Sequence, residues 1–277
     1  MGGVLSTTVT VAEQVRFGFG RGDQGGAGAD TPAAETEAPP IVPVNTQTSY
    51  VVPLQADLFD DKHKTLAVEN LVRNIREHNN TLTTGFIGTP YLNPVLSENG
   101  YSDVAYTLFE QDVYPSWLYP VKQGATTMWE RWNSYTIENG FGPVDMNSFN
   151  HYAYGAIGEW MFSRSLGIQR DEEKPGYKHI ILQPAIDFKG ELTYAKGYFE
   201  SPYGKISSGW EKTATGYVYR VTIPGNTTAS LNLVAPSENS VTVLTGKEGV
   251  GRISFANDLV KAELKSGTYE FEVKKQK

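Results

Sequence analysis

The decapeptide QGATTMWERW, residues 123–132, is the most unusual stretch of this 277-residue chain. It sets one carboxylate, Glu130, between two indoles, Trp129 and Trp132. The small residues that open it and the bulky ones that follow predict a helix over residues 125–135. On such a helix Trp129 and Trp132, three positions apart, share a face, while Glu130 points about 100° away from Trp129. The stretch thus predicts a carboxylate near a helix start, at the mouth of a helical barrel.

Glu130 has the surroundings of a general base. A neighbouring indole removes hydration and raises the pKa of a carboxyl group, whereas Arg131 or a helix N-terminus lowers it. A carboxylate that stays ionised and can still activate a water is what an inverting glycosidase requires. The same residues also allow an ion pair between Glu130 and Arg131 on the helix surface, and the sequence leaves both interpretations open.

A second unusual run, NSFNHYAYG, occupies residues 147–155. It predicts a helix over residues 150–166, capped by Ser148 or Asn150 and ended by Gly167. His151 would lie in the first turn, where a neutral imidazole could bind hydroxyl groups. A purely structural histidine is the alternative.

Two further runs could add aromatic walls: TTGFIGTPY at residues 83–91, which ends in Tyr91, and YPSWLYP at residues 114–120, which contains Trp117. Aromatic residues make up 12% of the chain, with 16 Tyr and 5 Trp. Tyr and Trp combine a flat apolar face with a polar edge, which suits stacking on sugar rings. An aromatic-rich core would have the same composition.

The chain divides into three parts by its hydrophobic pattern. Residues 1–44 are rich in Gly, Ala, Glu, Thr and Pro and predict a flexible leader. Residues 45–175 predict helical hairpins, with helices at about 46–59, 62–75, up to 96 and 100–112, an irregular segment at 114–123 and a loop at 136–148. Residues 176–277 alternate with period two, and we expect strands at 180–182, 192–198, 204–210, 217–223, 228–233, 241–244 and 269–273.

The four runs together resemble bacterial α-L-rhamnosidases, which are inverting glycoside hydrolases of the six-hairpin superfamily. The resemblance extends from about Asn45 to the SPYG run at residues 201–204. It implies an α+β multidomain protein, with a partial (α/α)6 six-hairpin barrel followed by an antiparallel β-sandwich. It also implies that Glu130 is the general base, that His151 contacts rhamnose, and that Trp117, Trp129, Trp132 and Tyr91 line the sugar site.

The resemblance leaves the general acid unassigned. An inverting site needs two carboxylates about 6.5–9.5 Å apart, with a water beside the base. Residues 1–44 hold no acidic residue in an aromatic or helical context, and the expected helices are too few to close six hairpins. We therefore expect a C-terminal part of a larger enzyme, partnered by the missing N-terminal half in trans or by self-association. A non-catalytic carbohydrate-binding fragment is the alternative.

The composition argues against several classes of binding partner. The formal net charge of −7 and the lack of any long run of Lys and Arg argue against nucleic acid. Without cysteine the chain has neither disulfides nor thiolate metal sites, and we expect no cofactor or metal. No apolar stretch is long enough for a membrane span and no signal peptide is recognisable, so the cytoplasm is the default compartment. The expected ligand is a rhamnose-containing glycoside or polysaccharide.

Overall fold

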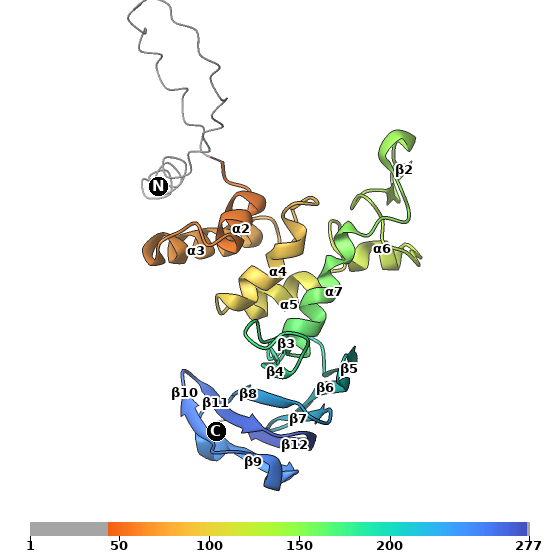
Figure 1. Ribbon diagram of the computed structural model, residues 1–277. Helices are drawn as coiled ribbons and strands as arrows, with labels where there is room; N and C mark the ends of the chain where they lie inside the picture. Colours follow the sequence, from red (N-terminus) through yellow and green to blue (C-terminus); the bar gives the residue numbers. More distant parts are fainter. Residues whose placement is uncertain (1–43, 276–277) are drawn as a thin grey trace, which may run out of the picture.

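The computed structural model describes residues 44–275, so the predicted leader lies outside the described residues except for Val44. Helices come first along the chain, and two stacked sheets lie beneath them, as Figure 1 shows. The described helices form part of a barrel and do not close one. The predicted order, a partial helical barrel followed by a sandwich, is confirmed. Every helix within residues 44–275 is too short or too polar to span a bilayer.

The first four helices form two antiparallel hairpins whose apolar faces meet. They are α2 (Gln47–Gln55), α3 (Asp61–Glu77), α4 (Thr89–Glu98) and α5 (Ser102–Glu110). The Asp60 carboxylate accepts the His63 N–H at 2.9 Å and so caps α3. Between the helices lie fully buried aliphatic side chains, among them Val51, Leu71, Ile75, Leu92, Leu96 and Leu108. All four helices lie where the periodicity predicts them.

The prediction of a helix over residues 125–135 is wrong. The short helix α6 (Leu118–Lys122) lies inside the segment predicted to be irregular, and Gly124, two residues beyond its end, has a φ of +86°. The chain then forms no helix until the hairpin of β1 (Tyr135–Thr136) and β2 (Gly140–Phe141), inside the predicted loop. The Glu130 N–H bonds to the Ser148 carbonyl, 18 positions further along the chain. This tertiary pairing replaces the helix.

The helix predicted over residues 150–166 begins later than expected. Two 3₁₀ turns, η1 (Val144–Met146) and η2 (Ala153–Ala156), precede α7 (Ile157–Trp160), which continues as a π-helical turn, η3 (Met161–Ser165). His151 is therefore not in a helix, because its N–H bonds to the Met128 carbonyl. The predicted end at Gly167 is confirmed, since its φ is +75°.

The sandwich consists of two five-stranded sheets. One has the order β10-β11-β8-β4-β3 and is built from β3 (Ile168–Arg170), β4 (His179–Leu182), β8 (Thr228–Val234), β10 (Ser254–Ala256) and β11 (Leu259–Leu264). The other has the order β5-β6-β7-β12-β9 and is built from β5 (Tyr194–Ser201), β6 (Gly204–Thr213), β7 (Gly216–Ile223), β9 (Val241–Thr245) and β12 (Gly267–Lys274). The seven predicted strands are present. Short turns η4 (Glu238–Ser240) and η5 (Lys247–Gly249) flank β9.

The sandwich departs from the prediction in two ways. Strands β3, β10 and β11 were not predicted, and β3 pairs with β4 across the division that the sequence places near residue 176. In addition, β4 and β8 pair in parallel, whereas the other strand pairs are antiparallel, so this sheet is mixed.

Buried polar contacts fix the helical part on the sandwich. The hydroxyl of Tyr106 on α5 donates to the Ala185 carbonyl at 2.7 Å and lies 2.9 Å from the Ser165 hydroxyl oxygen. The Trp210 indole on β6 donates to the Ser165 carbonyl at 2.9 Å. The side chain of Asp187 is only 1% exposed and accepts bonds from two backbone N–H groups and from Lys212. The Tyr106 and Trp210 bonds join the helical part to the sandwich, and the Asp187 bonds order residues 187–192 beside β6.

Gly167 is required where the helical part meets the sandwich. A Cβ there would lie 2.2 Å from the Pro184 nitrogen, and the positive φ disfavours any side chain. We expect Gly167→Ala to lower the free energy of unfolding by more than about 1 kcal/mol. Gly158→Ala is the matched control, because a Cβ there meets nothing within 4 Å. Equal midpoints of urea unfolding for the two variants would contradict this role.

Candidate active site

The two unusual runs lie side by side and are joined by hydrogen bonds in both directions. The Glu130 N–H donates to the Ser148 carbonyl at 2.9 Å, and the Ser148 N–H donates to Glu130 Oε2 at 2.7 Å. The His151 N–H donates to the Met128 carbonyl at 2.8 Å. The Thr127 hydroxyl also bonds to the Phe149 carbonyl. The structure therefore brings the candidate base and the candidate sugar-binding histidine into one site.

The Glu130 carboxylate is half-buried, and its two oxygens differ in their surroundings. Oε2 accepts the Ser148 N–H, which fixes the direction of the side chain. Oε1 has no hydrogen-bond partner within residues 44–275. No ion pair joins Glu130 to Arg131 in the described chain, so the simple surface pairing is not formed. One carboxylate oxygen is held, and the other is available.

His151 is positioned by aromatic rings and by its own backbone. Its ring stacks with Phe86 at a centroid distance of 4.9 Å and with Tyr152 at 5.7 Å. The Ala153 N–H donates to Nδ1 at 3.3 Å, so in the neutral imidazole the proton is on Nε2. An Nε2–H group of this kind can donate to a hydroxyl oxygen. The sequence did not single out Phe86, although it lies in the run at residues 83–91.

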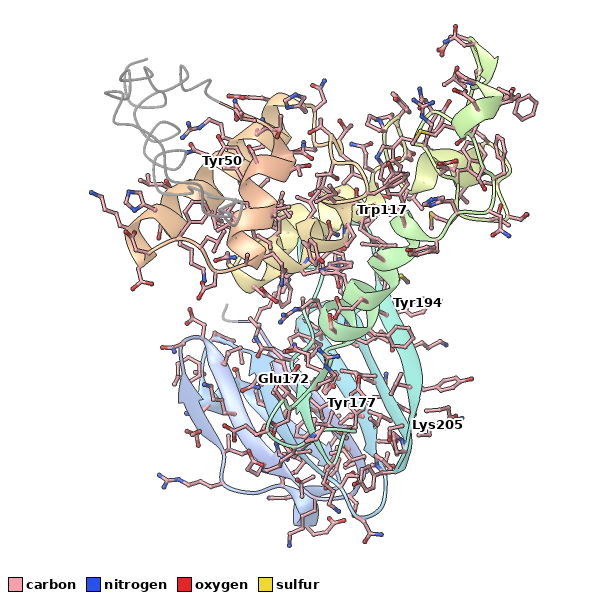
Figure 2. The ribbon with its side chains drawn as sticks, turned by 45° about the horizontal axis from the view of Figure 1, so that its top comes forward. Tyr50, Trp117, Glu172, Tyr177, Tyr194 and Lys205 are labelled. Carbon is pink, nitrogen blue, oxygen red and sulfur yellow. The ribbon has the colours of Figure 1, made fainter. Side chains whose placement is uncertain are left out.

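The indoles of Trp117 and Trp132 lie beneath the site in a packed cluster. Trp132 stacks face to face on Tyr154 with ring centroids 3.8 Å apart, and Trp117 meets Trp132 edge-on at 5.7 Å. Their N–H groups donate to backbone carbonyls, from Trp117 to Tyr154 at 2.9 Å and from Trp132 to Thr84 at 3.0 Å. Burial raises the pKa of Tyr154, and the charge of Arg131 partly offsets this. Figure 2 shows Trp117 inside the helical part.

Trp129 and Tyr91 differ in their exposure. Trp129 is 6% exposed and meets Phe149 edge-on at a centroid distance of 5.3 Å, so it holds the two paired runs together. Tyr91, near the start of α4, is 42% exposed, and it has no ring contact with the cluster among the described residues. Of the predicted aromatic walls, Tyr91 is thus the one most open to solvent, and the three indoles are covered by protein.

The described contacts of Glu130 include no second carboxyl group. Within residues 44–275, the hydrogen bond of the Glu130 carboxylate runs to backbone, and no second carboxylate shares it. The same part of the chain has no group of three or more His, Asp or Glu side chains that could hold a metal ion. The described contacts of Glu130 therefore orient one carboxylate and assign no general acid.

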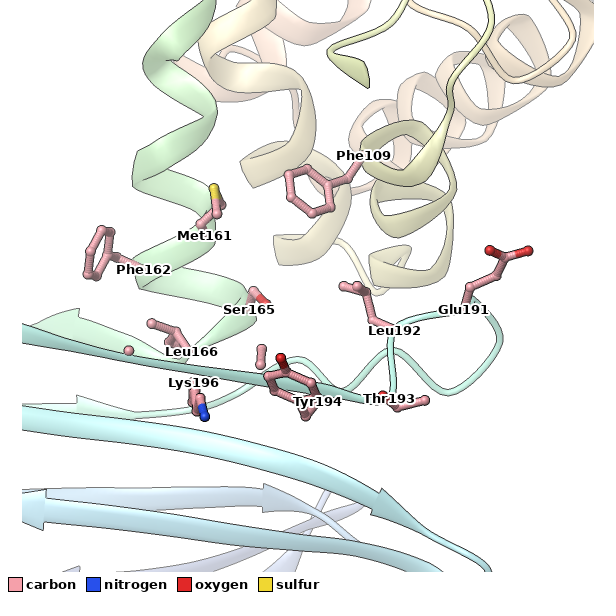
Figure 3. A pocket seen from close by; sticks show the side chains of 12 residues that line it. Phe109, Met161, Phe162, Ser165, Leu166, Glu191, Leu192, Thr193, Tyr194 and Lys196 are labelled. Atoms are coloured by element: carbon pink, nitrogen blue, oxygen red, sulfur yellow. The ribbon is translucent and has the colours of Figure 1, made fainter. Parts of the chain in front are cut away.

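A separate hollow of about 510 Å³ lies where the helices meet β5. Apolar side chains from both parts line it, among them Phe109, Met161, Phe162 and Leu192, as Figure 3 shows. Its one carboxylate is Glu191, and no member of the Glu130 cluster borders it. Because neither Glu130 nor His151 borders it, this hollow is separate from the candidate active site.

Two protein families match successive parts of the chain. Residues 27–164 match the bacterial alpha-L-rhamnosidase 6 hairpin glycosidase domain, and residues 167–248 match the bacterial alpha-L-rhamnosidase C-terminal domain. An alpha-L-rhamnosidase of Formosa agariphila is 42% identical over 233 residues, which cover 83% of this chain and 25% of that protein. One of Streptomyces avermitilis is 42% identical over 197 residues, covering 71% and 19% respectively.

Solved structures agree with these matches. The crystal structure of Streptomyces avermitilis alpha-L-rhamnosidase complexed with L-rhamnose aligns with a TM-score of 0.76 and 39% identity, over 83% of this chain and 22% of that one. The Aspergillus terreus enzyme aligns with a TM-score of 0.68 and 32% identity, over 83% and 24%. The chain thus spans about a quarter or less of the length of these relatives.

The stacked indole of Trp132 supports the site from below, so its removal should lower the stability of the protein. We expect Trp132→Ala to lower the free energy of unfolding by about 3–5 kcal/mol, because it opens a cavity beside Tyr154. Tyr152→Ala is the control, since Tyr152 is 89% exposed, and it should change stability by less than about 0.5 kcal/mol. Near-UV circular dichroism during urea unfolding measures both, and equal losses would contradict the supporting role.

Proposed function

Because the chain belongs to the bacterial α-L-rhamnosidase family, we propose that Glu130 is the general base of an inverting hydrolase that releases terminal α-L-rhamnose. The observation that carries this proposal is the mutual hydrogen bonding of Glu130 and Ser148. It leaves Oε1 unpaired within the described chain and holds Oε2, so the carboxylate is oriented and still able to take a proton.

The proposed reaction needs a second carboxyl group. Oε1 of Glu130 removes a proton from a water, whose oxygen attacks the anomeric carbon on the face opposite the leaving group. The bond from that carbon to the glycosidic oxygen breaks, and a general acid outside the described residues protonates the oxygen. The product sugar has the inverted configuration.

The other predicted site residues divide into two groups. His151, with its Nε2–H group, and the exposed Tyr91 are proposed to contact the sugar directly. Trp117, Trp129 and Trp132 are proposed to line the site from beneath and to hold Glu130 and His151 in place, because protein covers these indoles. The substrate would be a rhamnose-containing glycoside or polysaccharide.

Exposed apolar side chains support a partner for the helical part. They gather between residues 113 and 152, where β2 and α6 stand away from the other helices in Figure 1. They include Val113, Val121, Ile137, Phe141, Val144 and Tyr152. Monomeric soluble proteins rarely expose a large contiguous apolar patch. We propose that further helical hairpins, such as those that the longer relatives have room for, cover this surface and supply the acid.

A chimeric enzyme tests the role of Glu130. The part of Streptomyces avermitilis α-L-rhamnosidase that precedes the aligned segment would be fused to residues 45–275 of this chain. We expect the fusion to hydrolyse an aryl α-L-rhamnoside and Glu130→Gln to lower kcat by about 10²–10⁴. The amide keeps an acceptor for the Ser148 N–H, so folding should persist. A folded fusion without activity, or with activity unaffected by Glu130→Gln, would exclude this function.

The same fusion tests His151. Loss of one neutral hydrogen bond costs about 0.5–1.5 kcal/mol, so we expect His151→Ala to weaken L-rhamnose binding by about 2- to 13-fold. Asn150→Ala is the matched control, because its side chain is exposed. Tryptophan fluorescence during an L-rhamnose titration measures both affinities. Binding with no hydrolysis would favour the alternative of a carbohydrate-binding part, and unchanged binding in His151→Ala would remove the contact.

A further inference from the structure

The outer face of β5, β6 and β7 has a polar and aromatic surface that the proposed reaction does not use. β5 forms the edge of its sheet, and its residues alternate between the two faces. Tyr194, Lys196, Tyr198 and Glu200 point to solvent, whereas Phe199 packs against Tyr177. Figure 2 places Tyr194 and Lys205 on the same side of the sandwich.

The register of the three strands creates a hollow at Gly209. Lys196, Gly209 and Arg220 lie directly opposite one another on β5, β6 and β7, and Tyr194 lies opposite Glu211. Directly opposite residues of a sheet share a face, so these side chains surround a position that has none. The hollow measures about 490 Å³, within the range of ligand pockets, which is about 300–1,000 Å³.

Close packing keeps the floor of the hollow free of side chains. A Cβ on Gly209 would lie 3.0 Å from both the Ala195 carbonyl oxygen and the Lys196 Cβ. Any larger residue would push against the backbone of β5. The spacing of β5 and β6 therefore favours glycine at the floor of the hollow.

The wall of the hollow combines the exposed ring of Tyr194 with a fixed guanidinium group, and Tyr198 lies on the same face of β5 beyond the lining of the hollow. Tyr194 and Tyr198 are each 55% exposed. They lie four residues apart on one strand, which places them about 13 Å apart. Nη1 of Arg220 lies 3.2 Å from Glu211 Oε2, and its Nη2 lies 3.0 Å from Glu270 Oε1. The planar donor is thus held in one orientation beside the hollow.

The positive and negative charges on this face are equal in number, and this balance favours a neutral ligand. The cations Lys196, Lys205 and Arg220 face the anions Glu200, Glu211 and Glu270, and two of the three cations are paired. An anionic ligand would gain little net attraction from such a face, and an apolar ligand would bury charged groups at a cost. A neutral ligand with many hydroxyl groups and flat apolar patches would satisfy both the donors and the rings.

We propose that the outer face of β5, β6 and β7 binds a neutral saccharide. Tyr194 and Tyr198 stack on its rings, and Lys196, Glu211 and Arg220 bond to its hydroxyls. This site lies in the sandwich, separate from Glu130 in the helical part, and it does not depend on the proposed hydrolysis. It would hold a polymeric ligand on the protein at a second point.

NMR titration of the full chain tests the site, with methyl α-L-rhamnoside and cellotetraose as probes. We expect at least one probe to shift the amide signals of Lys196, Gly209 and Glu211. The double variant Tyr194→Ala, Tyr198→Ala should bind about tenfold more weakly. Because both rings are largely exposed, the variant should retain the amide pattern of the sandwich core, which the same spectra report.

Two controls make the result specific. Tyr203→Ala removes an exposed tyrosine in the turn between β5 and β6, outside the hollow, and should bind as the wild type does. Glu130→Gln should leave the shifts on β5 to β7 unchanged. Absence of shifts there with both probes, or equal affinity of the double variant and the wild type, would overturn the proposal. Loss of binding in Glu130→Gln would do the same.

Discussion

The mutual hydrogen bonds between Glu130 and Ser148 are the constraint on which the candidate site depends. They join two segments that form no regular strand or helix at this point, and they use both the backbone and the side chain of Glu130. Because the carboxylate is itself one of the acceptors, the same bond that aligns the chain also orients the candidate base. His151 follows three residues after Ser148, so its ring position is set by the same pairing.

The sandwich contributes to this site indirectly. It binds the helical part through Tyr106, Trp210 and the Glu110 carboxylate of α5, which accepts the Leu192 N–H. The π-helical turn η3 supplies Ser165 to the first two of these contacts, so the helix that follows His151 ends on the sandwich. The sandwich thereby supports one side of the helical part, which has too few hairpins to close a barrel. The exposed apolar residues lie on its other side, on the projecting segment around β2.

Much of the fold followed from the sequence. Periodicity predicted α2 to α5 and seven strands, because amphipathic helices and half-buried strands have repeating patterns. The helix predicted over residues 125–135 is wrong because the backbone there pairs with residues far along the chain. A local sequence pattern does not reveal such long-range pairing. The hairpin of β10 and β11 was missed, although Asn257 and Asp258, both with positive φ, are the residues that such a tight turn favours.

The sequence predicted that the runs around Glu130 and His151 belong together, but it did not predict how they contact each other. Glu130 and His151 were identified from the runs that contain them, but not the roles of Phe86 and Tyr154 in stacking on His151 and Trp132. The resemblance implied that Trp117 and Trp132 line the sugar site, and a sequence alone does not distinguish exposed from buried indoles. Their burial is set by Tyr154 and by the carbonyl of Thr84, which the sequence does not place beside them.

The most direct test of the pairing is hydrogen exchange at the Ser148 amide. Ser148 is exposed, so without its bond to Glu130 the amide should exchange at the rate of an unstructured chain. We predict clear protection in the wild type, retention of most of it in Glu130→Gln, and its loss in Glu130→Ala, with the Tyr106 amide in α5 as the unchanged reference. An unprotected Ser148 amide in the wild type would contradict the account of how Glu130 is held.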